Sequence, residues 1–256
     1  MPVESLLASL FSFQYSFWLL AAIALMAVLY SSVGHGGASG YLAAMALWGL
    51  APEEMRPAAL SMNIVVTSWL LYRFQPYKLM PYKLFWPLVI VSTPAAFIGG
   101  LWEIDAFSYH LLVGLLMALA ALRMIVSSRP VETVTLPPQW LLLTVGILLG
   151  FSAGMTGIGG GVFLSPILLI CGWCTVRQSA AVAAGFILLN SIAGLAGYMT
   201  SGQSWPLGSG WLMLAALGGC LLGAEIASHR GAPITLRKLL AGVLIIAAGK
   251  MILTAF

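Results

Sequence analysis

The sequence predicts an all-α polytopic membrane protein with two inverted repeats and about eight to ten membrane segments, some of them short broken or re-entrant helices after glycine-rich loops. Of the 256 residues, 61% are hydrophobic and only 7% are charged, whereas soluble domains carry roughly a quarter charged residues. Polar breaks are short, and two glycine-rich breaks recur in the two halves. Because a spanning helix needs about 20 apolar residues, no room remains for a separate soluble domain.

Apolar runs between charged or Pro/Gly-rich breaks predict ten segments. The first half holds 17–33, 37–50, 58–72, 84–102 and 107–127. The second half holds 140–156, 160–173, 178–199, 209–227 and 237–256. The predicted division is a first transmembrane repeat over 1–127, a linker over 128–139 and a second repeat over 140–256. No lysine or arginine precedes Arg56, so the first apolar stretch lacks the positive start of a signal peptide and is expected to be retained.

An internal repeat is predicted by superposing the halves at an offset of 123 residues. The aligned pairs are Gly34 with Gly157, Gly36 with Gly159, Gly37 with Gly160, Gly49 with Gly172, Ala58 with Ala181 and Ser68 with Ser191. Spaced glycines are a more specific signal than shared hydrophobicity. The two halves are therefore expected to have the same plan of helices.

The charged residues predict how the chain crosses the membrane, because basic residues in short loops stay on the cytoplasmic side. The basic connections carry Arg73, Lys78, Lys83, Arg129, Arg177, His229, Arg230, Arg237 and Lys238. The N-terminus with Glu4, the loops 51–57 and 102–109 and the turn 200–208 are acidic or uncharged and are assigned outside. The two sets alternate only if each half crosses an odd number of times, so the halves are expected to be inverted.

Two short segments are expected to be broken or re-entrant helices. Segments 37–50 and 160–173 span only about 21 Å as helix, which is short of the roughly 30 Å hydrocarbon core. Each follows a glycine-rich loop, SSVGHGGASG or SAGMTGIGGG. Matching short, glycine-interrupted segments in inverted repeats indicate the substrate site of a transporter.

The glycine loops are predicted to bind an anion. Backbone that leaves the helix inside a membrane is tolerated only where protein or a cavity surrounds it, and bare N–H groups at a helix N-terminus attract anions. The alternative is that the glycines only permit close helix packing. The predicted substrate-binding residues are Ser31, Ser32, Gly34, His35, Gly36, Gly37, Asn63, Thr156, Gly157, Gly159, Gly160, Gly161 and Asn190. A nucleotide-binding loop is not expected, since no Gly-Lys-Ser/Thr follows.

The stretch from Phe151 to Pro166, FSAGMTGIGGGVFLSP, together with its weaker copy at 34–40, resembles the TauE/SafE family of sulfite and organosulfur-anion exporters. The resemblance covers nearly the whole chain and implies secondary transport of small anions such as sulfite, sulfonates or related organic acids. The family motif maps onto Gly157, Gly159, Gly160, Gly161 and Pro166, and its first copy onto Gly34, Gly36 and Gly37. The first copy departs from the family pattern at His35 and Ala38.

Several polar residues within the segments are candidates for a further role. His35 lies in the first loop and can donate to an anion or respond to pH, or it can cap backbone groups. Asn63 and Asn190 can bind substrate oxygens or bridge helices. Glu103 and Glu225 are candidates for proton coupling, although both lie near segment ends, where an interfacial carboxylate is the simpler interpretation.

Other function classes find less support in the sequence. Cys171 and Cys174 have the spacing of a redox pair but lack the strand-then-helix setting of that motif. No carboxylate or histidine cluster has metal-ligand spacing, and no hydrolase signature occurs, so neither an enzyme nor a cofactor is expected. The expected partners are a small anion and the lipid bilayer of a prokaryotic inner membrane, and no nucleic acid. A carrier or channel for a cation or a metal remains the alternative, with a membrane redox protein less favoured.

Overall fold

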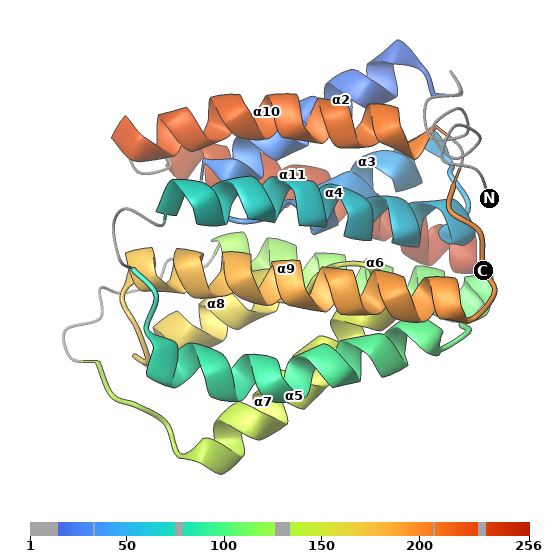
Figure 1. Cartoon of the computed structure of the whole chain (residues 1–256). Coiled ribbons are helices and arrows are strands. Elements are labelled where there is room, and N and C mark those ends of the chain that lie inside the picture. Colours follow the sequence, from blue (N-terminus) through green and yellow to red (C-terminus); the bar gives the residue numbers. More distant parts are fainter. Residues whose placement is uncertain (1–14, 33, 75–78, 126–133, 207, 230–233) are drawn as a thin grey trace.

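The computed structural model describes residues 15–32, 34–74, 79–125, 134–206, 208–229 and 234–256, and these residues form ten α-helices and no strand (Figure 1). The first-half helices are α2 (Phe17–Ser31), α3 (Ala38–Trp48), α4 (Pro52–Phe74), α5 (Tyr82–Leu101) and α6 (Ala106–Ile125). The second-half helices are α7 (Gln139–Thr156), α8 (Gly161–Ile170), α9 (Val176–Thr200), α10 (Ser209–His229) and α11 (Ile234–Ala255).

Each of the ten predicted segments corresponds to one helix, so the all-helical prediction is confirmed. One boundary is wrong: the predicted loop 51–57 is helical from Pro52 onward. Proline suits the first position of a helix, where its missing N–H is not needed, and Glu53 and Glu54 complement the positive end of the helix dipole in the first turn.

Part of the predicted topology falls outside the residues described. This holds for positions 128–133 of the predicted linker and for Glu4, Lys78, Arg129 and Arg230. It also holds for the side chains of His229, Arg237 and Lys238.

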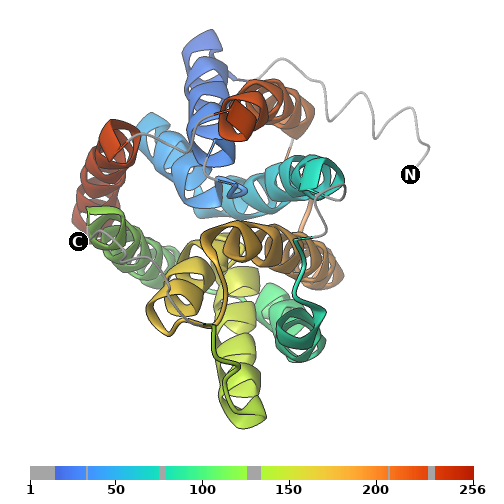
Figure 2. The same ribbon diagram turned by 90° about the vertical axis from the view of Figure 1, so that its left-hand side faces the viewer.

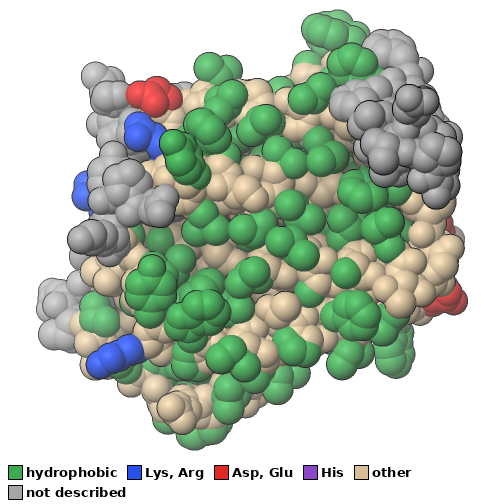
Figure 3. All heavy atoms as spheres, in the orientation of Figure 1, with side chains coloured by type: hydrophobic (Ala, Val, Ile, Leu, Met, Phe, Trp, Pro, Cys, Tyr) green, Lys and Arg blue, Asp and Glu red, His purple; other side chains and the backbone are tan. Residues whose placement is uncertain are grey.

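Among the described residues, three helices are long and apolar enough to cross a membrane: α5, α7 and α9. The 23-residue α4 is longer than two of these helices, but Glu53, Glu54, Arg56 and Arg73 make it less apolar. Hydrophobic side chains spread over the middle of the face in Figure 3, and the charged ones lie at its two ends. This distribution is the one expected of a protein surrounded by lipid.

The two ends of the bundle carry opposite charges. We call the end with Glu53, Glu103 and Asp105 the acidic end. We call the end with Arg73, Lys83 and Arg177 the basic end. The helix α4 runs from the acidic end to the basic end, and α9 runs in the opposite direction.

Helices α2 and α3 form a hairpin, which we call the first hairpin. The indole Nε1 of Trp48, at the end of α3, donates to Oγ of Ser16 just before α2 at 3.0 Å. The beginning of α2 therefore lies beside the end of α3, and the glycine loop between them forms the tip. The chain then enters α4 at Pro52, so this hairpin opens at the acidic end.

Helices α7 and α8 form the second hairpin. The N–H of Thr135, shortly before α7, donates to the carbonyl of Gly172 after α8 at 3.0 Å. This hairpin opens at the basic end, where α9 begins with Val176. In Figure 1 the first hairpin opens toward the right and the second toward the left, so the two glycine loops point inward from opposite ends.

The helices of the two halves pack on each other more than on their own neighbours. Helix α5 packs on α7 and α9, α10 packs on α2 and α4, and α6 packs on α11. Helices α4 and α9 lie side by side at the centre, as Figure 2 shows. Glycines permit these close approaches: a Cβ on Gly99 of α5 would collide with the carbonyl of Phe151 on α7, and a Cβ on Gly223 of α10 with the carbonyl of Val28 on α2.

Candidate functional site

The tip of the first hairpin is a buried turn built on glycine. Gly34 and Gly37 have φ angles of 79° and 95°, a left-handed conformation that side chains disfavour. Gly37 is the N-cap residue of α3 and provides no side chain to accept from the first-turn N–H groups. Because such groups have no acceptor within the helix, α3 begins inside the protein with an uncapped, positive end.

The tip of the second hairpin repeats this geometry. Gly157, Gly159 and Gly160 have φ angles of 82°, 76° and 71°. Gly160 is the N-cap residue of α8 and likewise provides no side-chain cap. The hydroxyl of Thr156 supports the turn by accepting from the N–H of Ile158 at 3.3 Å. Positive-φ glycines thus recur at the sequence offset of 123, at 34 and 157, 37 and 160, and 49 and 172.

The two loops meet at the amide of Asn63 on α4. A Cβ on Gly36 would lie 3.1 Å from Asn63 Oδ1, and a Cβ on Gly159 would lie 2.7 Å from Asn63 Nδ2. The same Cβ atoms would lie 3.2 and 3.0 Å from Cγ2 of Ile187 on α9. One amide and one isoleucine therefore contact both loops, and we call Gly36, Gly159, Asn63 and Ile187 the glycine-loop centre.

The polar groups at the centre link the two halves. Asn63 Nδ2 lies 3.3 Å from Oγ of Ser191 on α9, to which it donates. His35 of the first loop pairs its Nε2 with Oγ of Ser165 on α8 at 2.8 Å. At the centre, Asn63 Oδ1 is buried and accepts no hydrogen bond from the described residues, and the same holds for Asn190 Oδ1 elsewhere on α9. The centre therefore holds a buried acceptor oxygen, Asn63 Oδ1, that receives no hydrogen bond from the described residues.

The structure brings some of the predicted residues together and leaves others apart. Gly36, Asn63 and Gly159 share contacts at the centre, and His35, the residue before Gly36, bonds to Ser165 of α8. Most of the remaining predicted residues are buried in or beside the loops: Ser31, Ser32, Gly34, Gly37, Thr156, Gly157, Gly160 and Gly161. Ser32, directly after α2, donates to the carbonyl of Leu29 within that helix. Asn190 donates to the carbonyl of Phe186, likewise within its own helix.

The two predicted proton-coupling carboxylates lie far from the centre, at opposite ends of the bundle. Glu103 lines a pocket at the acidic end. Glu225 is 62% exposed at the basic end, where its Oε2 lies 3.6 Å from a guanidinium nitrogen of Arg73. The two carboxylates therefore lie at the acidic and the basic end of the bundle, and neither is part of the glycine-loop centre.

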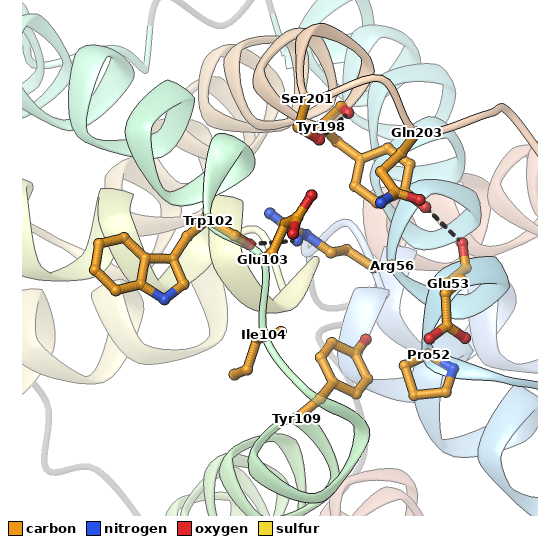
Figure 4. A pocket seen from close by; sticks show the side chains of 10 residues that line it. All are labelled: Pro52, Glu53, Arg56, Trp102, Glu103, Ile104, Tyr109, Tyr198, Ser201 and Gln203. Carbon is orange, nitrogen blue, oxygen red and sulfur yellow. Dashed lines mark hydrogen bonds between the residues drawn. The ribbon is translucent and has the colours of Figure 1, made fainter.

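A pocket of about 180 Å³ opens at the acidic end (Figure 4). Residues of α4, α9 and the loop after α5 line it, with Arg56 reaching between them. The lining consists of Pro52, Glu53, Arg56, Trp102, Glu103, Ile104, Tyr109, Tyr198, Ser201 and Gln203. Sequence reasoning missed Arg56, Tyr109 and Tyr198. The available signal was an arginine in a segment assigned outside, contrary to the usual preference of basic residues for the cytoplasmic side.

The guanidinium of Arg56 binds carbonyls at the ends of two helices. Its Nη2 donates to the carbonyls of Gly99 and Gly100, both at 2.7 Å, near the end of α5. Its Nη1 donates to the carbonyl of Trp102 at 3.1 Å, and its Nε donates to the carbonyl of Gly154, near the end of α7, at 3.0 Å. Terminal carbonyls lack helical donors, so one cation completes both ends and meets their negative dipole charge.

Tyrosines complete the cluster. The ring of Tyr198 lies under the guanidinium of Arg56, with 5.2 Å between Cζ and the ring centroid. The hydroxyl of Tyr109 donates to the carbonyl of Thr156 at 3.0 Å, where α7 ends and the second glycine loop begins. Through Tyr109, the lining of the pocket is therefore hydrogen-bonded to the start of the second glycine loop.

Cys171 and Cys174 differ in exposure and form no disulfide. Cys171 and Cys174 are free thiols, the first exposed and the second buried. Burial raises the pKa of the Cys174 thiol to about 11, whereas redox-active cysteines have a lowered pKa that favours the thiolate. These observations do not support the alternative of a membrane redox protein.

Buried uncapped helix ends, hairpins that enter from opposite ends and an apolar outer surface are the features expected of a membrane transport protein. The family model described as "Sulfite exporter TauE/SafE" matches residues 19–251. A protein of Sinorhizobium fredii (strain NBRC 101917 / NGR234), described as "Probable membrane transporter protein y4hK", is 34% identical over 239 residues, covering 91% of this chain and 97% of that protein. No solved structure matches.

The chain therefore belongs to the TauE/SafE family. It is an integral membrane transporter and not an enzyme. The family description implies a small anionic substrate.

Proposed function

We propose that this chain is a secondary transporter that exports sulfite, a sulfonate or a related small organic acid across a prokaryotic inner membrane. The substrate site is the glycine-loop centre. The observation that carries this proposal is that Gly36 and Gly159, each directly before the uncapped N-terminus of a buried helix, both lie against Asn63. Two positive helix ends and their bare N–H groups suit an anion without the desolvation of a buried lysine or arginine.

The transport cycle that we propose is alternating access between two inverted repeats, 1–127 and 140–256. Two observations support it. The two hairpins open toward opposite ends of the bundle, and most helices pack on helices of the other half. At the centre the side chains of Asn63 and Ile187 fill the space beside both loops. The described conformation is therefore closed around the site, and one hairpin must move for an anion to enter.

Glu103 and Glu225 are our candidates for proton coupling at the two exits of this path. A carboxylate at each exit can exchange a proton with the water on its own side. The test is sulfite flux driven by a proton gradient, measured for Glu103→Gln and Glu225→Gln in proteoliposomes. Loss of the gradient's effect, with downhill flux retained, is the expected result for the coupling residue.

The main test compares glycine variants in proteoliposomes loaded with sulfite. Gly159→Ala is expected to abolish downhill flux, because its Cβ would lie 2.7 Å from Asn63 Nδ2. Gly202→Ala is the matched control: Gly202 has a φ of 84°, so the substitution strains the backbone equally, but nothing lies within 4 Å of its Cβ. Flux equal to that of empty liposomes for the unaltered protein would refute the proposal.

One observation favours a cation as the second candidate substrate. The unpartnered oxygens Asn63 Oδ1 and Asn190 Oδ1 are acceptors, which suit a cation or a donor group. The same liposomes distinguish the two candidates, since sodium uptake without sulfite would favour the cation. Sulfite flux that needs no sodium would favour the anion.

A further inference from the structure

Arg56 is a buried cation whose contacts are carbonyl oxygens. Arg56 is only 5% exposed. Among the described residues, no carboxylate lies within ion-pair distance of its guanidinium. Glu53 and Glu103 line the same pocket. A buried guanidinium needs its donors satisfied in place, and the carbonyls of α5 and α7 satisfy them only while the ends of both helices stay close to α4.

We infer that Arg56 is a positioning residue for transport, which holds the acidic end of the bundle closed by tying α4 to the ends of α5 and α7. The inference rests on the alternating access proposed above. In the open state the guanidinium releases the carbonyl of Gly154 and the end of α7 moves away from α4. That movement opens a path from the pocket to the second glycine loop.

The position of the second loop against Arg56 supports this inference. A Cβ on Gly157 would lie 3.0 Å from the carbonyl oxygen of Arg56 and 3.2 Å from its Cα. Tyr109 holds the carbonyl of Thr156, one residue earlier. Any separation of α7 from α4 therefore displaces the second loop, which forms one side of the glycine-loop centre.

The hydrogen bonds of the Arg56 guanidinium are suited both to hold the acidic end closed and to release it. Charge-assisted hydrogen bonds are strong when buried. Three of the four carbonyls belong to α5 and α7 and the fourth to Trp102 directly after α5, and only tertiary packing brings them together. The pocket gives water access to the cluster, so water or an arriving anion can replace the carbonyls around the guanidinium. At the basic end, the pair of Arg73 and Glu225 has side chains that are 35% and 62% exposed, and so partly solvated a pair is expected to contribute little.

The test measures how accessible the second loop is from each side of the membrane. Ile158, which is 2% exposed, is replaced by cysteine in a chain whose three native cysteines are changed to alanine. Labelling by a membrane-impermeant maleimide is followed in intact cells and in inside-out vesicles. Arg56→Gln is expected to speed labelling from the acidic side about tenfold or more, since it removes several charge-assisted bonds, and to leave labelling from the basic side unchanged or slower.

Arg73→Gln is the matched control, because it removes an arginine from the other end of the same helix. It is expected to leave labelling at the acidic side unchanged. Arg56→Lys keeps the charge with fewer donors and is expected to give an intermediate rate. It also replaces Arg56→Gln if that variant does not yield a monodisperse protein. Equal labelling rates for the folded Arg56 variants and the unaltered side chain would overturn the inference.

The labelling needs no substrate, so its outcome is separate from that of the proposed function. Faster labelling in the Arg56 variants, without sulfite flux in the unaltered protein, would support the role of Arg56 and contradict sulfite as the substrate. Sulfite flux in the unaltered protein, with unchanged labelling in the Arg56 variants, would support sulfite as the substrate and contradict the role of Arg56.

Discussion

The hydroxyl of Tyr198 on α9 donates to the carbonyl oxygen of Glu53 on α4 at 2.9 Å. This carbonyl is the one that Pro57 leaves without a helical donor, because proline has no N–H to give to the residue four positions earlier. A proline inside one helix is therefore compensated by a tyrosine from the other half of the chain.

This relationship predicts a rescue. Tyr198→Phe is expected to lower the free energy of unfolding by about 1 kcal/mol, the cost of a lost buried hydrogen bond. Pro57→Ala supplies an N–H that can donate to the Glu53 carbonyl, so Tyr198→Phe should cost much less in that background. Thermal unfolding in detergent measures both effects. Tyr72→Phe, at a tyrosine that is 67% exposed, is the control, and an equal cost of Tyr198→Phe in both backgrounds would contradict the explanation.

Two adjacent glycines of α10 are expected to respond differently to alanine. A Cβ on Gly219 would collide with the carbonyl of Ala24 on α2, whereas a Cβ on Gly218 would meet nothing within 4 Å. Gly219→Ala should lower the free energy of unfolding by about 1–3 kcal/mol through overpacking. Gly218→Ala should leave it unchanged or raise it by up to about 1 kcal/mol, because alanine favours helix. Similar unfolding midpoints for the two variants would show that α10 does not pack on α2 in this way.

The contact between His35 and Ser165 predicts coupling between the first loop and α8. In a double-mutant cycle of His35→Ala and Ser165→Ala, the interaction free energy is expected to be about 1 kcal/mol. Thermal unfolding gives the stability cycle, and sulfite flux gives the functional one. Ser152→Ala is the control, since its hydroxyl donates within its own helix to the carbonyl of Leu148. Strict additivity of His35→Ala and Ser165→Ala would mean that the contact contributes nothing.

The cysteines are expected to differ in reactivity. Cys171 is exposed and should react readily with a soluble maleimide. The Cys174 thiol has its pKa raised to about 11 by burial, so it stays protonated at neutral pH and should react slowly until the pH approaches that value or the protein unfolds. Intact mass after timed labelling measures the two sites. Transport that survives replacement of both cysteines is the expected functional result, and its loss would revive the redox alternative.

Much of the helical plan could be predicted because it depends on local sequence. Apolar runs of sufficient length and their glycine breaks fix where helices begin and end, and the breaks before α3 and α8 lie where the sequence indicates. The start of α4 differs from the prediction because charged residues such as those at 53, 54 and 56 are common in loops, whereas proline and acidic residues also favour a helix N-terminus.

The roles of Arg56 and Asn63 could not be predicted, because their partners are distant in sequence. Arg56 binds carbonyls that lie 43 and 98 residues away, and Asn63 bonds to Ser191, 128 residues away. Backbone carbonyls are present at every position, so no residue type marks the ones that will accept from a buried arginine. Only tertiary packing that places the ends of α5 and α7 beside the start of α4 brings them within reach.

Hydrophobic runs and glycines act locally along the chain, so the membrane helices and their two glycine breaks follow from the sequence alone. What those breaks face depends on tertiary packing. It turned each break into the tip of a hairpin, brought both tips to Asn63 and buried a cation against the ends of α5 and α7. These features arise from helix packing across the halves, where close approach of glycines and the need to satisfy buried polar groups select one arrangement.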